Sequence, residues 1–456
     1  MAGSLPFSKG LVVAALLSIA APARADENAS LEARVKRLEE QAAKNEAKPA
    51  AETARRPSAI VFSGFAHVDW VMFRQSSQNE ITQDGEPLNE NRFLVRRGRL
   101  RGESDRGYFH GAVEIEANTI KGPIVRPINV EASFKYPAER PYPSPVVDPA
   151  LVRDDGKPWF IVTTGLFRTP YGFEVPEPEN SRPWLERTTV SNALFPQSFD
   201  LGLRVLGGYR FARYSLGIMN GAPIGERAFP GRDPNESKDL VFRVGATTDV
   251  TESVHVEGGL SGLTGRGFHR GNPATKDQVV WRDLNEDTVI DPAELVAIAG
   301  SPASPSESFK RFAIGADLRA SIRVPVLGMF GARFEITRAS NLDRGLFFAD
   351  PVVAGRDLRE IGWYVGAHQE ITKWAMVGVR YDRYDPDSDA REREPYALVP
   401  RSFAQSTWSF SAAGRLSFAR LIAQYDLRSN ALGRDANGAP ATLKDDSFTL
   451  RAEVRF

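Results

Sequence analysis

The sequence predicts an all-β protein: a sixteen-stranded antiparallel transmembrane β-barrel preceded by a short N-terminal periplasmic coiled-coil helix. Three observations predict this fold class. Apolar and polar residues alternate along most of the chain from residue 60, the alternating segments run for about 10 to 15 residues, and their number is even. Such alternation gives each strand one apolar and one polar face. Tilted membrane-spanning strands need about ten residues, and closed bacterial barrels have even strand numbers.

The N-terminus has the pattern of an export signal. Lys9 precedes an apolar run from Leu11 to Ala21, and an A-x-A site ends at Ala25. The apolar run is too short to span a bilayer, so we predict a signal peptide at 1–25 rather than a buried N-terminal helix.

A short helix and a linker are expected next. Leu31, Val35, Leu38 and Ala42 recur at spacings of four, three and four, which predicts a coiled-coil segment within 26–45. Two heptads are marginal in water, so this segment is either an oligomerisation stub or a solvated amphipathic helix. The Ala-, Lys-, Glu- and Pro-rich stretch 46–58 predicts a linker, and the barrel is expected over 59–456.

The barrel strands follow from the period-two segments. We predict strands at 60–74, 92–103, 107–119, 128–137, 158–168, 200–211, 213–221, 238–249, 252–264, 309–324, 326–338, 360–372, 374–385, 404–418, 419–430 and 446–456. Short turns follow most even-numbered strands and long loops follow odd-numbered ones, as in outer-membrane barrels. The connection 138–157 departs from this rule because about twenty residues stand where a short turn is expected.

Aromatic residues near strand ends predict two interfacial girdles on the outside of the barrel. They are Trp70, Trp159, Trp363, Tyr364, Trp374, Tyr381, Tyr384, Trp408 and Tyr425. At the C-terminus, Phe448, Leu450, Ala452, Val454 and Phe456 share one strand face. A final Phe456 with this alternation resembles the signal that outer-membrane barrels present to their assembly machinery. We therefore expect the protein in the outer membrane of a Gram-negative bacterium, with both termini periplasmic.

Composition excludes several classes of function. The 456 residues include 58 basic and 58 acidic side chains, which argues against a nucleic-acid partner, and no cysteine, which removes disulfides and thiolate chemistry. The five histidines show no metal spacing, and neither a G-x-S-x-G nor a Walker-type motif occurs. We expect a protein that is not an enzyme and requires no cofactor.

Two motifs resemble a known family. One is Arg92-Phe-Leu-Val-Arg96-Arg97-Gly-Arg99-Leu-Arg101-Gly, and the other begins Gly165-Leu-Phe-Arg-Thr-Pro170-Tyr171-Gly172-Phe-Glu174 and continues to Met219-Asn220-Gly221. Over most of 60–456 the chain resembles the phosphate-selective porins of the O and P type. This resemblance implies a homotrimer of sixteen-stranded barrels whose third long loop, here 169–199, folds into the lumen. It also implies passive diffusion of small anions, with phosphate or polyphosphate as the substrate class.

Arginine suits anion selection because its planar fork stays charged and donates two parallel hydrogen bonds. Arg97, Arg99 and Arg101 share one strand face, opposite Leu94, Gly98 and Leu100, and three arginines facing lipid would be costly, so we expect them in the lumen. The candidate pore and anion-binding residues are Arg97, Arg99, Arg101, Arg168, Arg182, Arg187, Arg204, Arg243, Lys121 and Lys135.

Two alternatives stay open for these cations. Inward Arg and Glu residues on adjacent strands often pair as a structural network that stiffens the barrel wall. The family's phosphate site also uses lysines, and Lys121 and Lys135 are almost the only ones near a strand. A general or organic-solute porin without a phosphate site is the corresponding alternative function.

One segment of the long outside loop 265–308 has the spacing of an EF-hand calcium loop. The predicted ligands of a Ca²⁺ ion are Asp283, Asn285, Asp287, Val289 through its carbonyl, Asp291 and Glu294, over 283–294. Thr288 stands where glycine normally allows the sharp turn. An acidic surface loop is the simpler reading, and a calcium-stabilised surface or adhesive barrel is a further alternative function.

Overall fold

The computed structural model describes residues 60–74, 91–120, 122–140, 142, 158–222, 233–394, 397–400, 402–434, 440–443 and 445–456. The predicted signal peptide, coiled coil and linker, and Lys121, lie outside these residues. No helix in the described part is long and apolar enough to cross a membrane.

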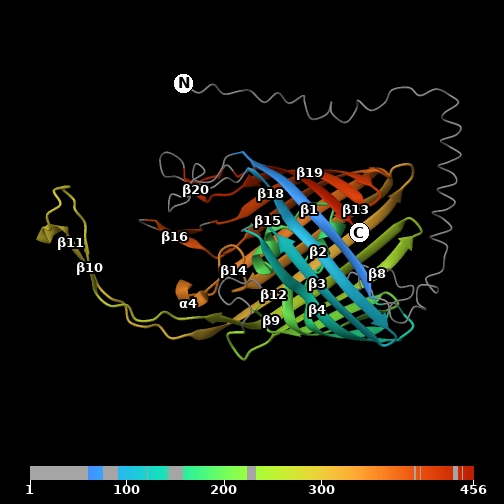
Figure 1. Ribbon diagram of the computed structural model, residues 1–456, viewed down its shortest axis with the longest axis horizontal. Coiled ribbons are helices and arrows are strands. Elements are labelled where there is room, and N and C mark those ends of the chain that lie inside the picture. The colour runs from blue at the N-terminus through green and yellow to red at the C-terminus, as the bar shows by residue number, and fades with distance from the viewer. Residues whose placement is uncertain are drawn as a thin grey trace, which may run out of the picture. The chain divides into compact units, whose positions relative to one another are not determined.

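Sixteen strands form one closed antiparallel barrel, which confirms the predicted fold class (Figure 1). They are β1 (Val61–Phe73), β2 (Arg92–Arg106), β3 (Phe109–Asn118), β4 (Ile124–Tyr136), β5 (Phe160–Arg168), β6 (Phe199–Tyr209), β7 (Ala212–Met219), β8 (Asp239–Thr251), β9 (Val254–His269), β12 (Glu307–Val324), β13 (Gly328–Ser340), β14 (Arg359–Thr372), β15 (Ala375–Asp385), β18 (Gln405–Leu416), β19 (Ala419–Ser429) and β22 (Ser447–Arg455). Each strand pairs with its neighbours in the chain, and β22 pairs with β1 to close the ring.

The two ends of the barrel differ in the length of their connections, as predicted. At the turn end, two or three residues join β2 to β3, β6 to β7, β8 to β9, β12 to β13, β14 to β15 and β18 to β19. The loop end carries most long connections, with small hairpins β10 (Gln278–Trp281) to β11 (Leu295–Ile298), β16 (Arg391–Glu394) to β17 (Ala397–Pro400) and β20 (Gly433–Arg434) to β21 (Pro440–Ala441). The β4–β5 connection at the turn end is long, as the sequence indicates, and its Tyr142 is buried against Ile161 and Leu206.

The faces of the strands are inverted relative to a water-soluble sandwich. Leu203 and Phe242 are exposed on the outside, whereas Arg204, Arg243 and Asp317 are buried inside. Outer apolar surface and a charged interior are typical of a barrel that faces lipid. The rings of Trp363, Tyr381 and Trp408 lie in contact, with centroids 5.3 and 4.9 Å apart.

The prediction of an outward position in the girdles is wrong for two residues. Tyr364 and Tyr384 are buried, with 2% and 0% of their surface exposed, and they face the interior. Tyr364 lies one residue after the outward Trp363 and Tyr384 three residues after the outward Tyr381, so both point to the opposite face. Tyr384 donates a hydrogen bond of 2.7 Å to Asp343. A tyrosine near a strand end therefore belongs to a girdle only when its parity matches the outer face.

A β-bulge in β2 changes the direction of its arginines. The pairing of β1 with β2 shifts between His67, opposite Arg97, and Val68, opposite Val95, so Arg96 is the extra residue. The bulge lets Arg96 and Arg97 both reach the lumen. It also places Leu94 opposite the buried Asp69, which corrects the prediction that Leu94 lies on the outer face.

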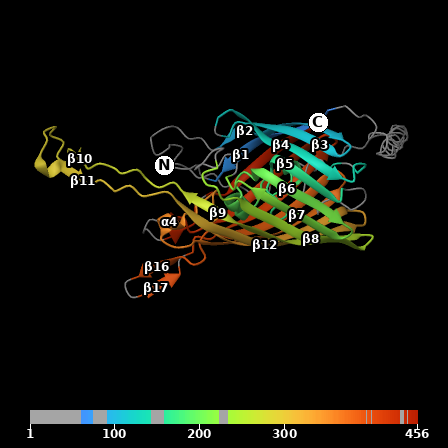
Figure 2. The ribbon, with the colours of Figure 1, turned by 90° about the horizontal axis from the view of Figure 1, so that it is seen from below.

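The connection 169–198 folds back into the barrel and packs against its inner wall (Figure 2). It contains the 3-10 turn η4 (Glu179–Ser181) and the helix α3 (Thr189–Leu194), and most of its residues are buried. Val190, Leu194 and Phe195 join Phe167 of β5 and Tyr384 of β15 in the largest apolar cluster. Apolar packing thus holds one side of this lumen loop.

Candidate functional site

The lumen loop begins with a turn that only glycine fits. Gly172 has a φ of 62°, and a Cβ there would lie 2.0 Å from Glu335 Oε1. Its N–H donates to Ser261 Oγ at 3.0 Å, and the N–H groups of Phe173 and Glu174 donate to Glu335 Oε2. These contacts carry the chain from β5 across to β9 and β13, on the far side of the lumen.

Four glutamates of the loop pair with arginines of the wall. Glu177 contacts Arg333 of β13 at 2.7 Å, and Glu179 contacts Arg99 of β2 at 2.6 Å. The remaining pairs are Glu174 with Arg380 at 3.4 Å, a second contact of Glu179 with Arg168 at 2.7 Å, and Glu186 with the arginines described next. Wall arginines therefore anchor the loop on several sides of the barrel.

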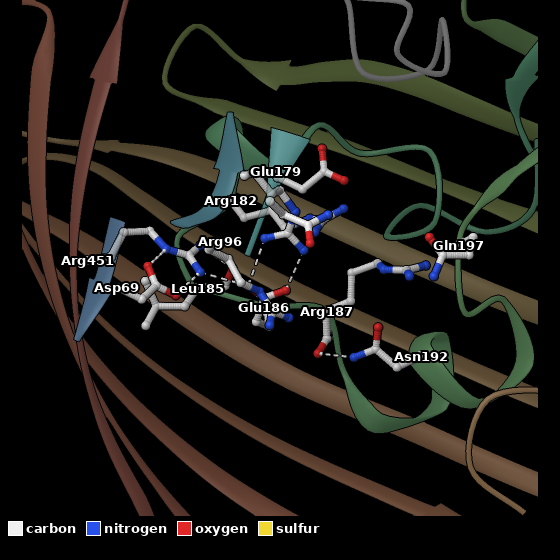
Figure 3. A network of polar contacts seen from close by, with 12 residues as sticks. Asp69, Arg96, Glu179, Arg182, Leu185, Glu186, Arg187, Asn192, Gln197 and Arg451 are labelled. Atoms are coloured by element: carbon white, nitrogen blue, oxygen red, sulfur yellow. Dashed lines mark hydrogen bonds and ion pairs between the residues drawn. The ribbon is translucent and has the colours of Figure 1, made fainter. Parts of the chain in front are cut away.

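Glu186 is held by three arginines at once (Figure 3). Its carboxylate accepts from Arg97 at 2.7 and 2.8 Å, from Arg96 at 3.0 Å, and from Arg451 of β22 at 2.8 Å. Arg451 also binds Asp69 in a bidentate pair. Burial raises the pKa of Glu186, but Arg96 and Arg97 outweigh it and hold the pKa well below its ordinary value. The carboxylate is thus ionised in neutral solution.

Neighbouring residues fix the geometry around Glu186. The Leu185 N–H donates to Gln424 Oε1 at 2.9 Å, and Arg451 donates to the Leu185 carbonyl at 2.9 Å. Thr188 is the N-cap of α3, and the Glu174 carboxylate accepts from its N–H and hydroxyl. Satisfied polar groups on both sides make this part of the loop a rigid element.

Arg187 differs from the other predicted arginines. It donates to the carbonyls of Phe195 and Pro196 at 2.8 and 3.0 Å, and it forms no ion pair with any residue in the described part of the chain. Burial lowers its pKa, and the guanidinium of Arg182 lowers it further. In Figure 3 its side chain extends away from Glu186 towards Gln197. Its charge is therefore not offset by a contacting carboxylate.

A charged cavity of about 380 Å³ lies beside the loop. Its walls come from Leu185, Glu186, Arg187, Thr189 and Asn192 of the lumen loop and from β1, β2, β15, β18, β19 and β22. The charged side chains that line it are Arg96, Arg187, Arg380, Arg428 and Arg451, with Asp69, Glu186, Asp382, Asp426 and Asp445. Polar walls of mixed sign can hold water and pass hydrated solutes, and fixed charges at the narrowest part discriminate between ions.

Most of the predicted pore cations are engaged with carboxylates. Arg97, Arg99 and Arg168 bind loop glutamates, Arg101 binds Glu131 at 3.0 Å, and Arg243 binds Asp317 at 2.6 Å. The others are Arg204, 3.7 Å from Glu131; Lys135, 2.8 Å from Asp105; and Arg182, which donates to the Glu177 carbonyl. The structural network weighed above accounts for these contacts.

Sequence reasoning missed three arginines of the cavity. Arg96 was hidden by the β2 bulge, which no alternation pattern reveals. Arg428 and Arg451 lie on the inward faces of β19 and β22. The same alternation that places the apolar residues of these strands on the outside places both arginines on the inside. The parity of the C-terminal strand alone could therefore have identified Arg451.

The EF-hand-like segment folds as a compact turn near β10 and β11. Asp283 accepts from the N–H groups of Asp287 and Thr288, and Thr288 adopts a left-handed φ of 63°. Glu294 accepts from Trp281 Nε1 at 3.1 Å. Among the described residues, no three His, Cys, Asp or Glu side chains are placed to hold a metal ion. Calcium binding at 283–294 stays a prediction.

No protein-family model and no curated protein matches the chain. Among solved structures, OprB of Pseudomonas putida is 9% identical, with 90% of this chain and 96% of that chain covered and a TM-score of 0.51. The outer membrane channel DcaP of Acinetobacter baumannii is 10% identical, with 87% and 97% covered and a TM-score of 0.49. An anion-selective porin from Comamonas acidovorans is 10% identical, with 87% and 99% covered and a TM-score of 0.45. At these identities the similarity concerns the fold alone.

Proposed function

We propose that this protein is an outer-membrane porin, a passive diffusion channel for small hydrophilic solutes. The observation that carries the proposal is the combination of a closed barrel with an apolar outside, a charged inside, and a loop anchored within the lumen. A membrane environment explains the exposed apolar face, and a water-filled interior explains the buried charges. The likeness of fold to OprB of Pseudomonas putida supports the same conclusion.

Within this function we propose a modest preference for anions that depends on Arg187. The other arginines of the cavity contact carboxylates, so their fields are largely cancelled at short range. Arg187 lines the cavity and lacks such a partner among the described residues. An anion passing the loop would therefore meet a positive charge that no contacting carboxylate offsets.

A dedicated phosphate site is less well supported than a general anion or organic-solute channel. Recognition of phosphate by arginine relies on the two parallel donors of the guanidinium fork. In Arg97, Arg99 and Arg243 these donors are already occupied by carboxylates. Phosphate or polyphosphate transport and homotrimeric assembly stay predictions that the resemblance implies.

The test is the reversal potential of the purified protein in a planar bilayer under a KCl gradient, repeated with phosphate added. We expect discrete channels, a weak anion preference, and little block of the chloride current by phosphate. Arg187→Gln should abolish the preference, whereas Arg106→Gln, an exposed arginine beyond the lumen that bonds Ser104, should leave it unchanged. Absence of channels would refute the porin proposal. Strong block of the chloride current by phosphate would instead support a phosphate site.

A further inference from the structure

Four basic side chains lie on the outer surface of the barrel near its loop end. Arg266 of β9, Lys310 of β12, Arg338 of β13 and Arg383 of β15 are exposed, and each stands one residue from a buried inward residue. The strands β9 and β12 run side by side in Figure 2. We call these four residues the outer basic band.

The band lacks acidic partners. None of its four side chains forms an ion pair or side-chain hydrogen bond with a described residue, in contrast to the paired arginines of the lumen. Arg266 and Lys310 are directly opposite in the β9–β12 register, an arrangement that is destabilising for like charges. Asp385 lies two residues after Arg383 on β15 but forms no ion pair with it. Arg359 is not part of the band because Asp357 lies 3.8 Å away. The band therefore calls for an anion from outside the chain.

The band borders the apolar surface. Arg383 is opposite Trp363 on β14, and Arg338 is opposite the exposed Ile314 on β12. The Trp363, Tyr381 and Trp408 rings lie in the same region, and such rings occupy the boundary between hydrocarbon and headgroups. The four cations therefore stand at the level where lipid headgroups begin.

We propose that the outer basic band binds the phosphate groups of phosphorylated lipid headgroups in the membrane leaflet at the loop end. This inference rests on the proposed membrane location. Lys and Arg side chains at this depth extend their charges towards the interface, where phosphates accept charge-assisted hydrogen bonds. Apolar residues directly beside the band, such as Ile314 and Phe312, can contact the acyl chains of the same lipid. A lipid satisfies both kinds of surface, which a free phosphate ion cannot.

The test measures retention of lipid by the full-length protein. Wild type and a Lys310→Gln/Arg338→Gln variant are reconstituted in phosphatidylcholine vesicles with and without lipid A, a bisphosphorylated glycolipid. The proteins are then extracted, and bound lipid is quantified by native mass spectrometry. Each cation near a charged surface changes affinity by roughly fivefold. The double variant should therefore bind lipid A roughly 25-fold more weakly.

Controls separate this inference from others. Arg106→Gln removes an exposed arginine at the opposite end of the barrel and should retain lipid A as wild type does. Excess inorganic phosphate should not displace the lipid, and displacement would indicate a simple anion site instead. Equal retention by wild type and double variant would overturn the inference. Channel conductance of both proteins is recorded in parallel, so that loss of the channel itself counts against the proposed function and not against the band.

Discussion

Neutralising Glu186 should make the channel more anion-selective and loosen the lumen loop. The Glu186→Gln substitution removes the carboxylate that three guanidiniums share and adds an amide donor that faces them. Arg451 keeps its bidentate pair with Asp69, but Arg96 and Arg97 lose the carboxylate that they contact. The net charge of the cavity wall therefore rises by one unit beside Arg96.

The expected size of both effects follows from the geometry. Removing one partner of a buried ion pair costs about 3–5 kcal/mol. The Glu186 side chain is 29% exposed, which reduces the expected loss to about 2–3 kcal/mol. At roughly 7 Å in a water-like dielectric, one unit charge changes the energy of an ion by about 0.6 kcal/mol, and screening in roughly 0.1 M salt about halves this. Anions and cations shift oppositely, so the permeability ratio should rise roughly three- to sevenfold.

The measurement is the reversal potential under a salt gradient, with thermal unfolding in detergent as the second readout. Glu177→Gln is the matched control because Glu177 also joins the loop to a wall arginine, Arg333, but does not line the cavity. It should lower stability comparably with a smaller change in selectivity. An unchanged permeability ratio in a folded Glu186→Gln channel would refute the reasoning.

Three further predictions concern the loops. Gly172→Ala places a Cβ against Glu335 at a left-handed φ, so it should displace the loop and raise conductance. It should also lower stability by more than Gly107→Ala, because the left-handed φ of Gly107 costs an alanine roughly 1–2 kcal/mol but brings its Cβ against no neighbour. Equal melting temperatures of the two variants would contradict this. Because arginines hold the pKa values of Glu179 and Glu186 well below 4.5, the stabilisation from these pairs is present above that pH and is lost only at lower pH; the loss of stability caused by Glu186→Gln in thermal unfolding should therefore be the same at pH 7 and at pH 4.5, and a clearly smaller loss at pH 4.5 would argue against anchoring by this carboxylate. Calcium should bind 283–294 with a dissociation constant of roughly 10⁻⁴–10⁻³ M in calorimetry after chelator treatment, and Asp283→Asn should weaken it; absence of binding heat together with an unchanged melting temperature would refute the site.

Alternation and connection length predicted the barrel because both are local consequences of a strand with two different faces. Each strand reveals its own orientation, so Arg243 and Asp317 could be placed in the lumen from parity alone. Their pairing at 2.6 Å could not, since it depends on side-chain reach across the sheet. Parity also fails wherever a bulge adds a residue, which is why Arg96 was missed and Leu94 was assigned to the wrong face.

The contacts between the lumen loop and the wall could not be predicted from the sequence for a different reason. Glu177 meets Arg333 across 156 positions of sequence, and the encounter is set by the path that the loop takes from Gly172. A motif resemblance can imply that a loop enters the lumen, but it carries no information on which wall arginine each glutamate binds. Arginines that sequence alone assigns to a solute can therefore be used by the fold.

The pairing of β1 with β22 has a consequence for biogenesis. Phe65 lies opposite Arg455, so the seam joins the two strands that are farthest apart along the barrel sequence. Until that seam forms, both strands expose unpaired backbone groups that can template aggregation. Such long-range pairing is also slow, because the entropy of closing the whole ring must be lost before any bond compensates it. Substitutions along this seam should therefore lower the yield of inserted barrel more than they lower the stability of barrels already closed.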